Sequence, residues 1–109
     1  MFTYAERAFD ALGDPTRRAV FKRLRAGTLS VKEIAEGLKV TRPAVSQHLK
    51  VLKEARLVVD RAEGTRRLYA VDRRGLAEVR EWLDAFWDET LAAFKRAAER
   101  EAREERKRR

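Results

Sequence analysis

Two short amphipathic segments within residues 30–53 constrain the fold of this chain most strongly. Ser30 and Glu33 have the spacing of a capping box that opens a helix, and Thr41 can cap a second helix over residues 41–54. Apolar residues recur in both segments at the spacing of one helix face. They are Val31, Ile34, Ala35 and Leu38 in the first segment, and Val45, Leu49 and Leu52 in the second. Two helices joined by a tight turn and packed on one core predict a helix-turn-helix.

The outward face of the second helix indicates what the pair binds. Its side chains are Arg42, Pro43, Ser46, Gln47 and Lys50, and no acidic residue precedes Glu54. Glutamine can contact adenine in two places, arginine reads guanine, and Lys50 can reach a phosphate. This face, together with Thr41 at the cap, fits the major groove of double-stranded DNA. An ordinary solvated polar face is the alternative.

The charge of the chain also favours an anionic partner. It has 26 basic and 18 acidic residues, a net charge of +8, and residues 41–74 alone carry 9 basic against 4 acidic residues. The excess of positive charge is therefore largest around the helix proposed to contact DNA. Basic composition alone equally fits a ribosome-associated or membrane-surface protein.

Composition predicts a soluble, cytoplasmic protein with no membrane partner. The chain has no cysteine, so it has neither a disulfide nor a thiolate metal site. It has no apolar run near the roughly 20 residues of a membrane span, and no apolar block of a signal peptide at its start. We expect one domain over residues 1–94 and a charged, fraying helical extension over residues 95–109.

The flanking segments complete a recognisable order of elements. One helix is outlined by Tyr4, Ala8, Phe9 and Leu12, and a second begins at Asp14-Pro15 and runs to about Ala26, where Gly27 ends it. After the helix pair, residues 57–62 and 67–71 are β-rich, and residues 63–65 between them are typical of a hairpin turn. Four helices, a hairpin and a final helix predict a mainly α winged helix-turn-helix.

The predicted hairpin is basic, with Arg61 on one strand and Arg66 and Arg67 just past the turn. Wings commonly contact phosphates or the minor groove, and these arginines fit that role. Alternatively, they only keep an edge hairpin soluble.

The last helix, from about Asp72, carries a broad apolar stripe that a small domain cannot easily cover. We interpret it as a homodimer interface built with the first helix, because bulky aromatic residues are typical interface anchors. The predicted interface residues are Tyr4, Phe9, Trp82, Leu83, Phe86, Trp87 and Leu91. Packing within its own domain and a ligand pocket are the alternatives.

Three motifs together give the chain a family resemblance. Residues 12–18 (LGDPTRR), residues 44–52 (AVSQHLKVL) and the turn at residues 63–65 resemble the ArsR family of bacterial winged-helix repressors, over roughly residues 5–91. The resemblance implies a homodimer joined through its first and last helices, with the helix over residues 41–54 in the major groove of a palindromic operator. It also implies repression by occluding a promoter, often that of its own operon.

The metal sites of that family have no counterpart here. Where metal-sensing relatives place two cysteines, this chain has Ser30-Val31-Lys32, and thiolates are needed for a soft-metal site. Asp84 and Asp88 on the last helix have no accompanying histidine. The chain therefore resembles the metal-independent branch, and we expect no metal or other cofactor.

A further departure lies in the turn after the second helix of the pair. Relatives usually place glycine there, and this chain has Arg56. If the backbone keeps a positive φ, Arg56 costs about 1 kcal/mol relative to glycine. A phosphate contact by its guanidinium is one way in which the residue could be used.

The sequence thus predicts a sequence-specific DNA-binding regulator rather than an enzyme. It contains no nucleophile with a base, no glycine-rich phosphate loop and no carboxylate pair in a pocket context, and its only histidine is His48. The alternative is a winged helix used as a protein-interaction or assembly module without specific DNA reading. Nothing in the sequence names an effector.

Overall fold

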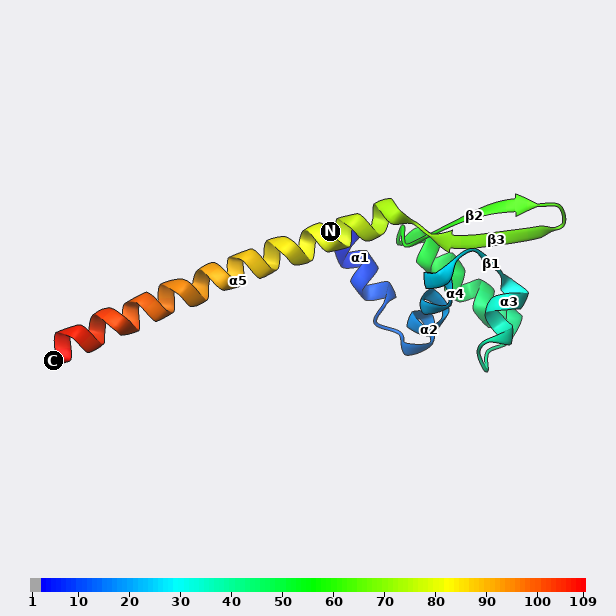
Figure 1. Ribbon diagram of the computed structural model, residues 1–109. Helices are drawn as coiled ribbons and strands as arrows, with labels where there is room; N and C mark the ends of the chain where they lie inside the picture. Colours follow the sequence, from blue (N-terminus) through cyan, green and yellow to red (C-terminus); the bar gives the residue numbers. More distant parts are fainter. Residues whose placement is uncertain (1–2) are drawn as a thin grey trace. The chain divides into compact units, whose positions relative to one another are not determined.

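The computed structural model describes residues 3–109 and has the predicted winged helix-turn-helix order, with a small antiparallel sheet (Figure 1). The elements are α1 (Tyr4–Ala11), α2 (Pro15–Arg23), the 3-10 turn η1 (Leu24–Ala26), β1 (Leu29–Ser30), α3 (Val31–Glu36), α4 (Arg42–Glu54), β2 (Val58–Glu63), β3 (Arg66–Val71) and α5 (Arg73–Arg108).

The first two helices begin at side-chain caps. Thr3 and Glu6 form a capping box at α1, and Asp14 Oδ1 accepts a hydrogen bond from the backbone N–H of Arg17 (3.0 Å) at the start of α2. That bond is the main reason why the pKa of the Asp14 carboxyl lies below its ordinary value. The predicted end at Gly27, which has φ 152°, is confirmed, although the last turn before it is the 3-10 segment η1.

The helix pair forms as its caps predict. The Glu33 carboxylate accepts from the backbone N–H of Ser30 (3.0 Å), and the Ser30 hydroxyl accepts from that of Glu33 (3.2 Å). Thr41 caps α4 by accepting from the N–H of Ala44 (3.3 Å), as predicted, and the regular helix begins at Arg42. Val31, Ala35 and Leu38 are partly buried against the core, and the other four predicted apolar side chains of the helix pair are fully buried. These four are Ile34, Val45, Leu49 and Leu52.

The sheet has three strands in the order β1-β3-β2, of which the sequence predicted two. The hairpin strands each lie within one residue of the predicted ranges, and a two-residue loop joins them, with Gly64 at φ 62°. The missed strand, β1, is only two residues long and pairs Leu29 with Tyr69 and Ser30 with Leu68. Its short length gives no detectable alternation, and Ser30 at its end carries the stronger signal of a helix cap.

The turn after α4 keeps a positive φ, which was stated from the sequence as a condition and not as a prediction. Arg56, at φ 61°, is the one non-glycine residue with positive φ among residues 3–109. Its N–H bonds the carbonyl of Lys53 (3.0 Å), and the N–H of Leu57 bonds the carbonyl of Leu52 (2.9 Å), which is the pattern of a Schellman motif. The arginine therefore occupies the position that glycine normally takes at such a helix end.

The last helix begins where Asp72 caps it, by accepting from the N–H of Arg74 (3.0 Å). The chain divides into two compact units, one reaching to Val79 and the other running from Arg80 to Arg109. Residues 95–108 are helical, without a break at the predicted domain boundary. None of the helices within residues 3–109 is long and apolar enough to cross a membrane.

Candidate nucleic-acid interface

Helix α4 separates its core from its polar face as the sequence predicted. Val45, Leu49 and Leu52 are fully buried, while every residue proposed to contact DNA is exposed. Those residues are Thr41, Arg42, Pro43, Ser46, Gln47 and Lys50 on or beside α4, and Arg61, Arg66 and Arg67 on the hairpin. The first turn of α4 has no acidic residue, so nothing within that turn offsets the positive end of the helix dipole.

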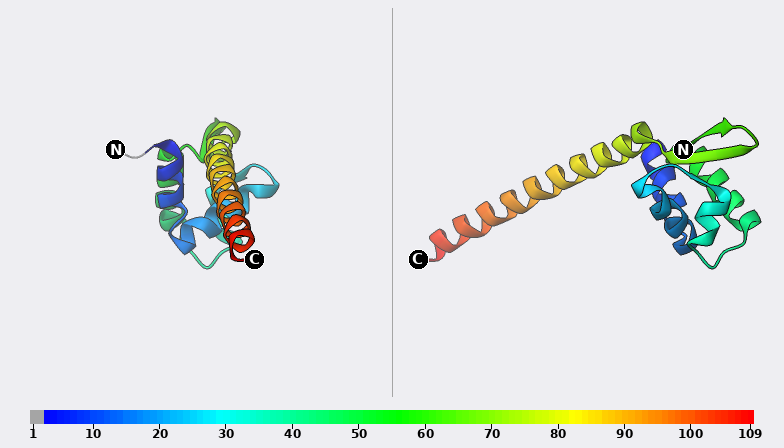
Figure 2. Two further views of the ribbon diagram at one scale, coloured as in Figure 1. Left: turned by 90° about the vertical axis from the view of Figure 1, so that its left-hand side faces the viewer. Right: turned by 45° about the vertical axis from the view of Figure 1, so that its right-hand side comes forward.

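The hairpin of β2 and β3, which we call the wing, projects beside α3 and α4, with its turn at the free end (Figure 1 and the right-hand view of Figure 2). Its register pairs Arg61 with Leu68, Ala62 with Arg67 and Glu63 with Arg66. Because side chains alternate along a strand, Arg61 and Arg66 lie on one face of the wing and Arg67 lies on the other. The three wing arginines therefore do not all extend from the same face of the hairpin.

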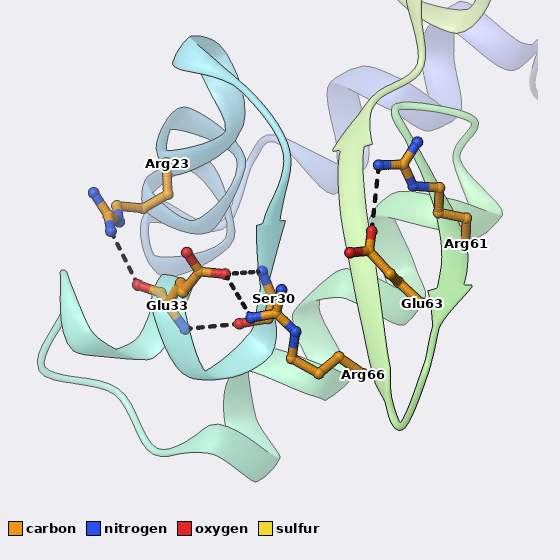
Figure 3. Close-up of polar contacts among 6 residues, drawn as sticks. All are labelled: Arg23, Ser30, Glu33, Arg61, Glu63 and Arg66. Carbon is orange, nitrogen blue, oxygen red and sulfur yellow. Dashed lines mark hydrogen bonds and ion pairs between the residues drawn. The ribbon is translucent and has the colours of Figure 1, made fainter.

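Two of the wing arginines are held by loose ion pairs (Figure 3). Arg61 Nη2 lies 3.7 Å from Glu63 Oε2, and Arg66 Nη1 lies 3.8 Å from Glu33 Oε1. All four side chains are at least 42% exposed. Exposed pairs of this length contribute little to stability, so both guanidiniums remain available to a ligand. The backbone N–H of Ser30, followed by its hydroxyl, holds the pKa of the Glu33 carboxyl below its usual value, and Arg66 adds to the effect.

The third arginine belongs to a tighter group. The Asp60 carboxylate lies 2.7 Å from Lys53 Nζ and 2.7 Å from Arg67 Nη1, and only 7% of the Asp60 side chain is exposed. The contact with Lys53, then that with Arg67, lowers the pKa of Asp60 despite the opposing effect of burial. Lys53 and Asp60 were not among the residues predicted from the sequence. The diagonal Asp60–Arg67 pairing follows from the hairpin register, but the contact with Lys53 depends on how the wing packs on α4.

A surface depression joins the start of α4 to the wing. It is lined by Arg42 from α4, by Arg66 and Arg67 from β3, and by α3 residues that include Lys32 and Glu36. The structure therefore brings one predicted contact residue of the helix and two of the wing to the same concave surface.

The predicted dimer residues differ in their surroundings. Most are exposed, from 38% for Trp82 to 61% for Trp87, and the Trp82 ring stacks on that of Phe86 at 5.5 Å. Phe9 is partly buried against the core of its own chain.

Tyr4 is 43% exposed, and the Arg56 guanidinium lies 3.6 Å above its ring. The structure thus gives the Arg56 side chain a cation–π contact with α1.

Ser30, one of the residues at the family's first metal position, is engaged in the fold, whereas Lys32 is exposed. Ser30 is 6% exposed, and its hydroxyl is used in the capping box of α3. Within residues 3–109, no group of three or more histidine, cysteine, aspartate and glutamate side chains is arranged to hold a metal ion.

The comparisons with known proteins agree with this architecture. Residues 12–61 match a family model described as a helix-turn-helix domain. The chain is 56% identical over 96 residues to the HTH-type transcriptional regulator Rv2034 of Mycobacterium tuberculosis, covering 86% of this chain and 90% of that protein. It is 32% identical to the transcriptional repressor SdpR of Bacillus subtilis, covering 69% and 83%.

Solved structures give the same result. An ArsR-like transcriptional regulator from Rhodococcus superposes with a TM-score of 0.71 at 31% identity, covering 87% of this chain and 92% of that one. A homodimeric winged helix-turn-helix DNA-binding domain from Mycobacterium bovis, described as a possible ArsR-family regulator, gives 0.64 at 28% identity, covering 81% and 82%. This chain belongs to the ArsR family of winged helix-turn-helix transcriptional regulators.

Proposed function

We propose that this regulator is a homodimeric repressor that binds a palindromic DNA operator, with α4 in the major groove and the wing on the backbone or in the minor groove. The observation that carries the proposal is the division of α4 into a fully buried apolar side and an exposed, acid-free polar side over residues 42–50. A helix of this kind fits a groove lined by base edges and phosphates.

The polar side chains of α4 divide into two roles. Gln47 and Ser46 are short enough to meet base edges where the helix lies closest to the groove floor, and Arg42 can reach guanine from the first turn. Lys50 and the wing arginines reach phosphates, which fix register and supply affinity without distinguishing sequences.

Two copies of α4 are needed to read a palindrome. The exposed aromatic residues of α5 provide a surface that a second copy can cover, and Trp87, at 61% exposed, is the most exposed of its tryptophans. A two-fold dimer places equivalent helices on half-sites about one helical turn apart, so we expect a symmetric operator. Repression then follows from occlusion of a promoter, in the cytoplasm and on nucleoid DNA.

A fluorescence-anisotropy titration tests the proposal. One labelled duplex carries DNA from upstream of the protein's own operon, and a second of equal length carries an unrelated sequence; both are titrated at several salt concentrations. We expect tighter binding to the upstream duplex and a steep loss of affinity with salt, because phosphate contacts release counterions. Equal affinity for both duplexes would contradict operator reading at that site.

A protein-interaction module without specific DNA reading is the second candidate function, and the exposed aromatic face of α5 favours it. Partner binding by such a module would be insensitive to Gln47→Ala and Arg66→Ala. A loss of DNA discrimination in Gln47→Ala would instead favour the repressor.

A further inference from the structure

An acidic side chain lies among the cations of the proposed DNA-binding surface. The side chain of Asp60, on β2, is 7% exposed, whereas those of its partners Lys53 and Arg67 are 56% and 55% exposed. A phosphate approaching this surface therefore meets the ammonium and guanidinium groups rather than the carboxylate between them.

The three residues come from three different elements. Lys53 lies in the last turn of α4, and Arg67 lies on β3, diagonally across the hairpin from Asp60. Each cation is 2.7 Å from a different carboxylate oxygen, Lys53 from Oδ1 and Arg67 from Oδ2. The carboxylate thus joins the end of α4 to both strands of the wing.

The charges explain why such an arrangement suits DNA. One carboxylate between two cations leaves a net charge of +1, so the group still attracts phosphate. Long side chains lose rotamer freedom when they bind, and a partner that already holds both heads in place reduces that cost.

We propose that Asp60 is a positioning residue that holds Lys53 and Arg67 as a phosphate-binding pair and fixes the wing against the end of α4. The inference rests on the proposed DNA-binding function. It adds Lys53 to the DNA contacts and gives an acidic residue a favourable role in binding a polyanion.

The test depends on the sign of the effect. Removing a negative charge near DNA ordinarily strengthens binding, so Asp60→Asn should raise affinity if Asp60 acts only through its charge. Under the proposal, Asp60→Asn weakens binding to the upstream duplex by about eightfold at 0.1 M salt for each phosphate that the variant no longer binds. The salt slope, which is the slope of the logarithm of the binding constant against the logarithm of the salt concentration, falls in magnitude by about one for each such phosphate. Glu63→Gln is the matched control, because it removes an acid from the same strand that pairs loosely with Arg61 alone, and its affinity should stay unchanged or rise.

The same substitution made in a variant that lacks both cations distinguishes a positioning role of Asp60 from a general role in stability. In the Lys53→Gln/Arg67→Gln double variant, Asp60 has no cation left to orient. Adding Asp60→Asn to that double variant should leave affinity unchanged or raise it, whereas the same substitution weakens binding in the wild type. A weakening of equal size in both backgrounds would overturn the proposal.

Circular dichroism and gel filtration establish that each variant is folded and has the oligomeric state of the wild type. If Asp60→Asn does not fold, Lys53→Gln and Arg67→Gln carry the test, and each should lower the salt slope by about one. No change in either slope would overturn the inference, as would stronger binding by folded Asp60→Asn. Failure of the wild type to bind any duplex would instead refute the proposed function itself, and this inference with it.

Discussion

Replacing Gly75 by alanine should destabilise the protein, although alanine is the better helix former. Gly75 lies in the first turn of α5 and is buried. A Cβ built on it would lie 1.5 Å from the Arg56 carbonyl oxygen and 2.6 Å from the carbonyl carbon. The obstacle is backbone, and the Schellman hydrogen bonds that close the turn after α4 hold it in place.

The size of the effect follows from these distances. An ordinary carbon–oxygen contact is about 3.3 Å, so α5 or the turn must move by about 2 Å to admit the methyl group. Overpacking by one methylene lowers the free energy of unfolding by about 1–3 kcal/mol. The higher helix propensity of alanine than of glycine raises it by at most about 1 kcal/mol. We therefore expect Gly75→Ala to lower the free energy of unfolding by about 2 kcal/mol or more.

Urea denaturation at one fixed protein concentration measures this decrease in the free energy of unfolding. We expect it to lower the urea concentration at the midpoint of unfolding by about 1 M. Gly37→Ala is the matched control, because its Cβ would meet the Arg23 guanidinium, a flexible group that can rotate away. We expect the control to change the free energy of unfolding by less than about 1 kcal/mol, the worth of the one Arg23 hydrogen bond to the Glu33 carbonyl. A neutral or stabilising Gly75→Ala would refute the close packing of α5 on the turn after α4.

Three further predictions concern binding, assembly and pH. Gln47→Ala should cost about 1–3 kcal/mol at particular base pairs, whereas a phosphate-contact variant weakens all sequences alike; titration of single-base operator variants separates the two. Trp87→Glu should give monomers in sedimentation velocity and weaken operator binding, while Ala92→Glu, which places the same charge on the opposite side of the same helix, should remain dimeric. The lowered carboxyl pKa values of Asp14, Glu33 and Asp60 mean that their stabilisation is complete above the ordinary values of 3.8 and 4.5 and is lost as pH falls below them. Urea denaturation at pH 7, 4 and 3 should show this decline, and equal stability at all three would contradict it.

Local signals in the sequence were sufficient to predict the helices and the hairpin. Caps such as Ser30, Thr41 and Asp14 act within three residues of where they stand, and a helix face repeats over a short window. The sequence left open whether the turn at Arg56 keeps a positive φ, and the structure has it because α4 ends in the turn that normally takes glycine at that position.

The features that the sequence did not reveal depend on contacts between elements. Strand β1 forms because β3 is available as a partner, and the separation of Arg67 from Arg61 and Arg66 follows from the hairpin register. The burial of Asp60 between Lys53 and Arg67 requires the wing to pack on α4. Such contacts leave no periodic pattern, since the residues involved are isolated charges in a chain rich in charge.

The central claim, that this regulator reads a symmetric site through two copies of α4, is tested most directly by hydroxyl-radical footprinting on DNA from upstream of its own operon. We predict two protected patches related by a dyad, with centres about 10 base pairs apart, and both should weaken together in Trp87→Glu. A single protected patch, or uniform weak protection that matches unrelated DNA, would contradict the account.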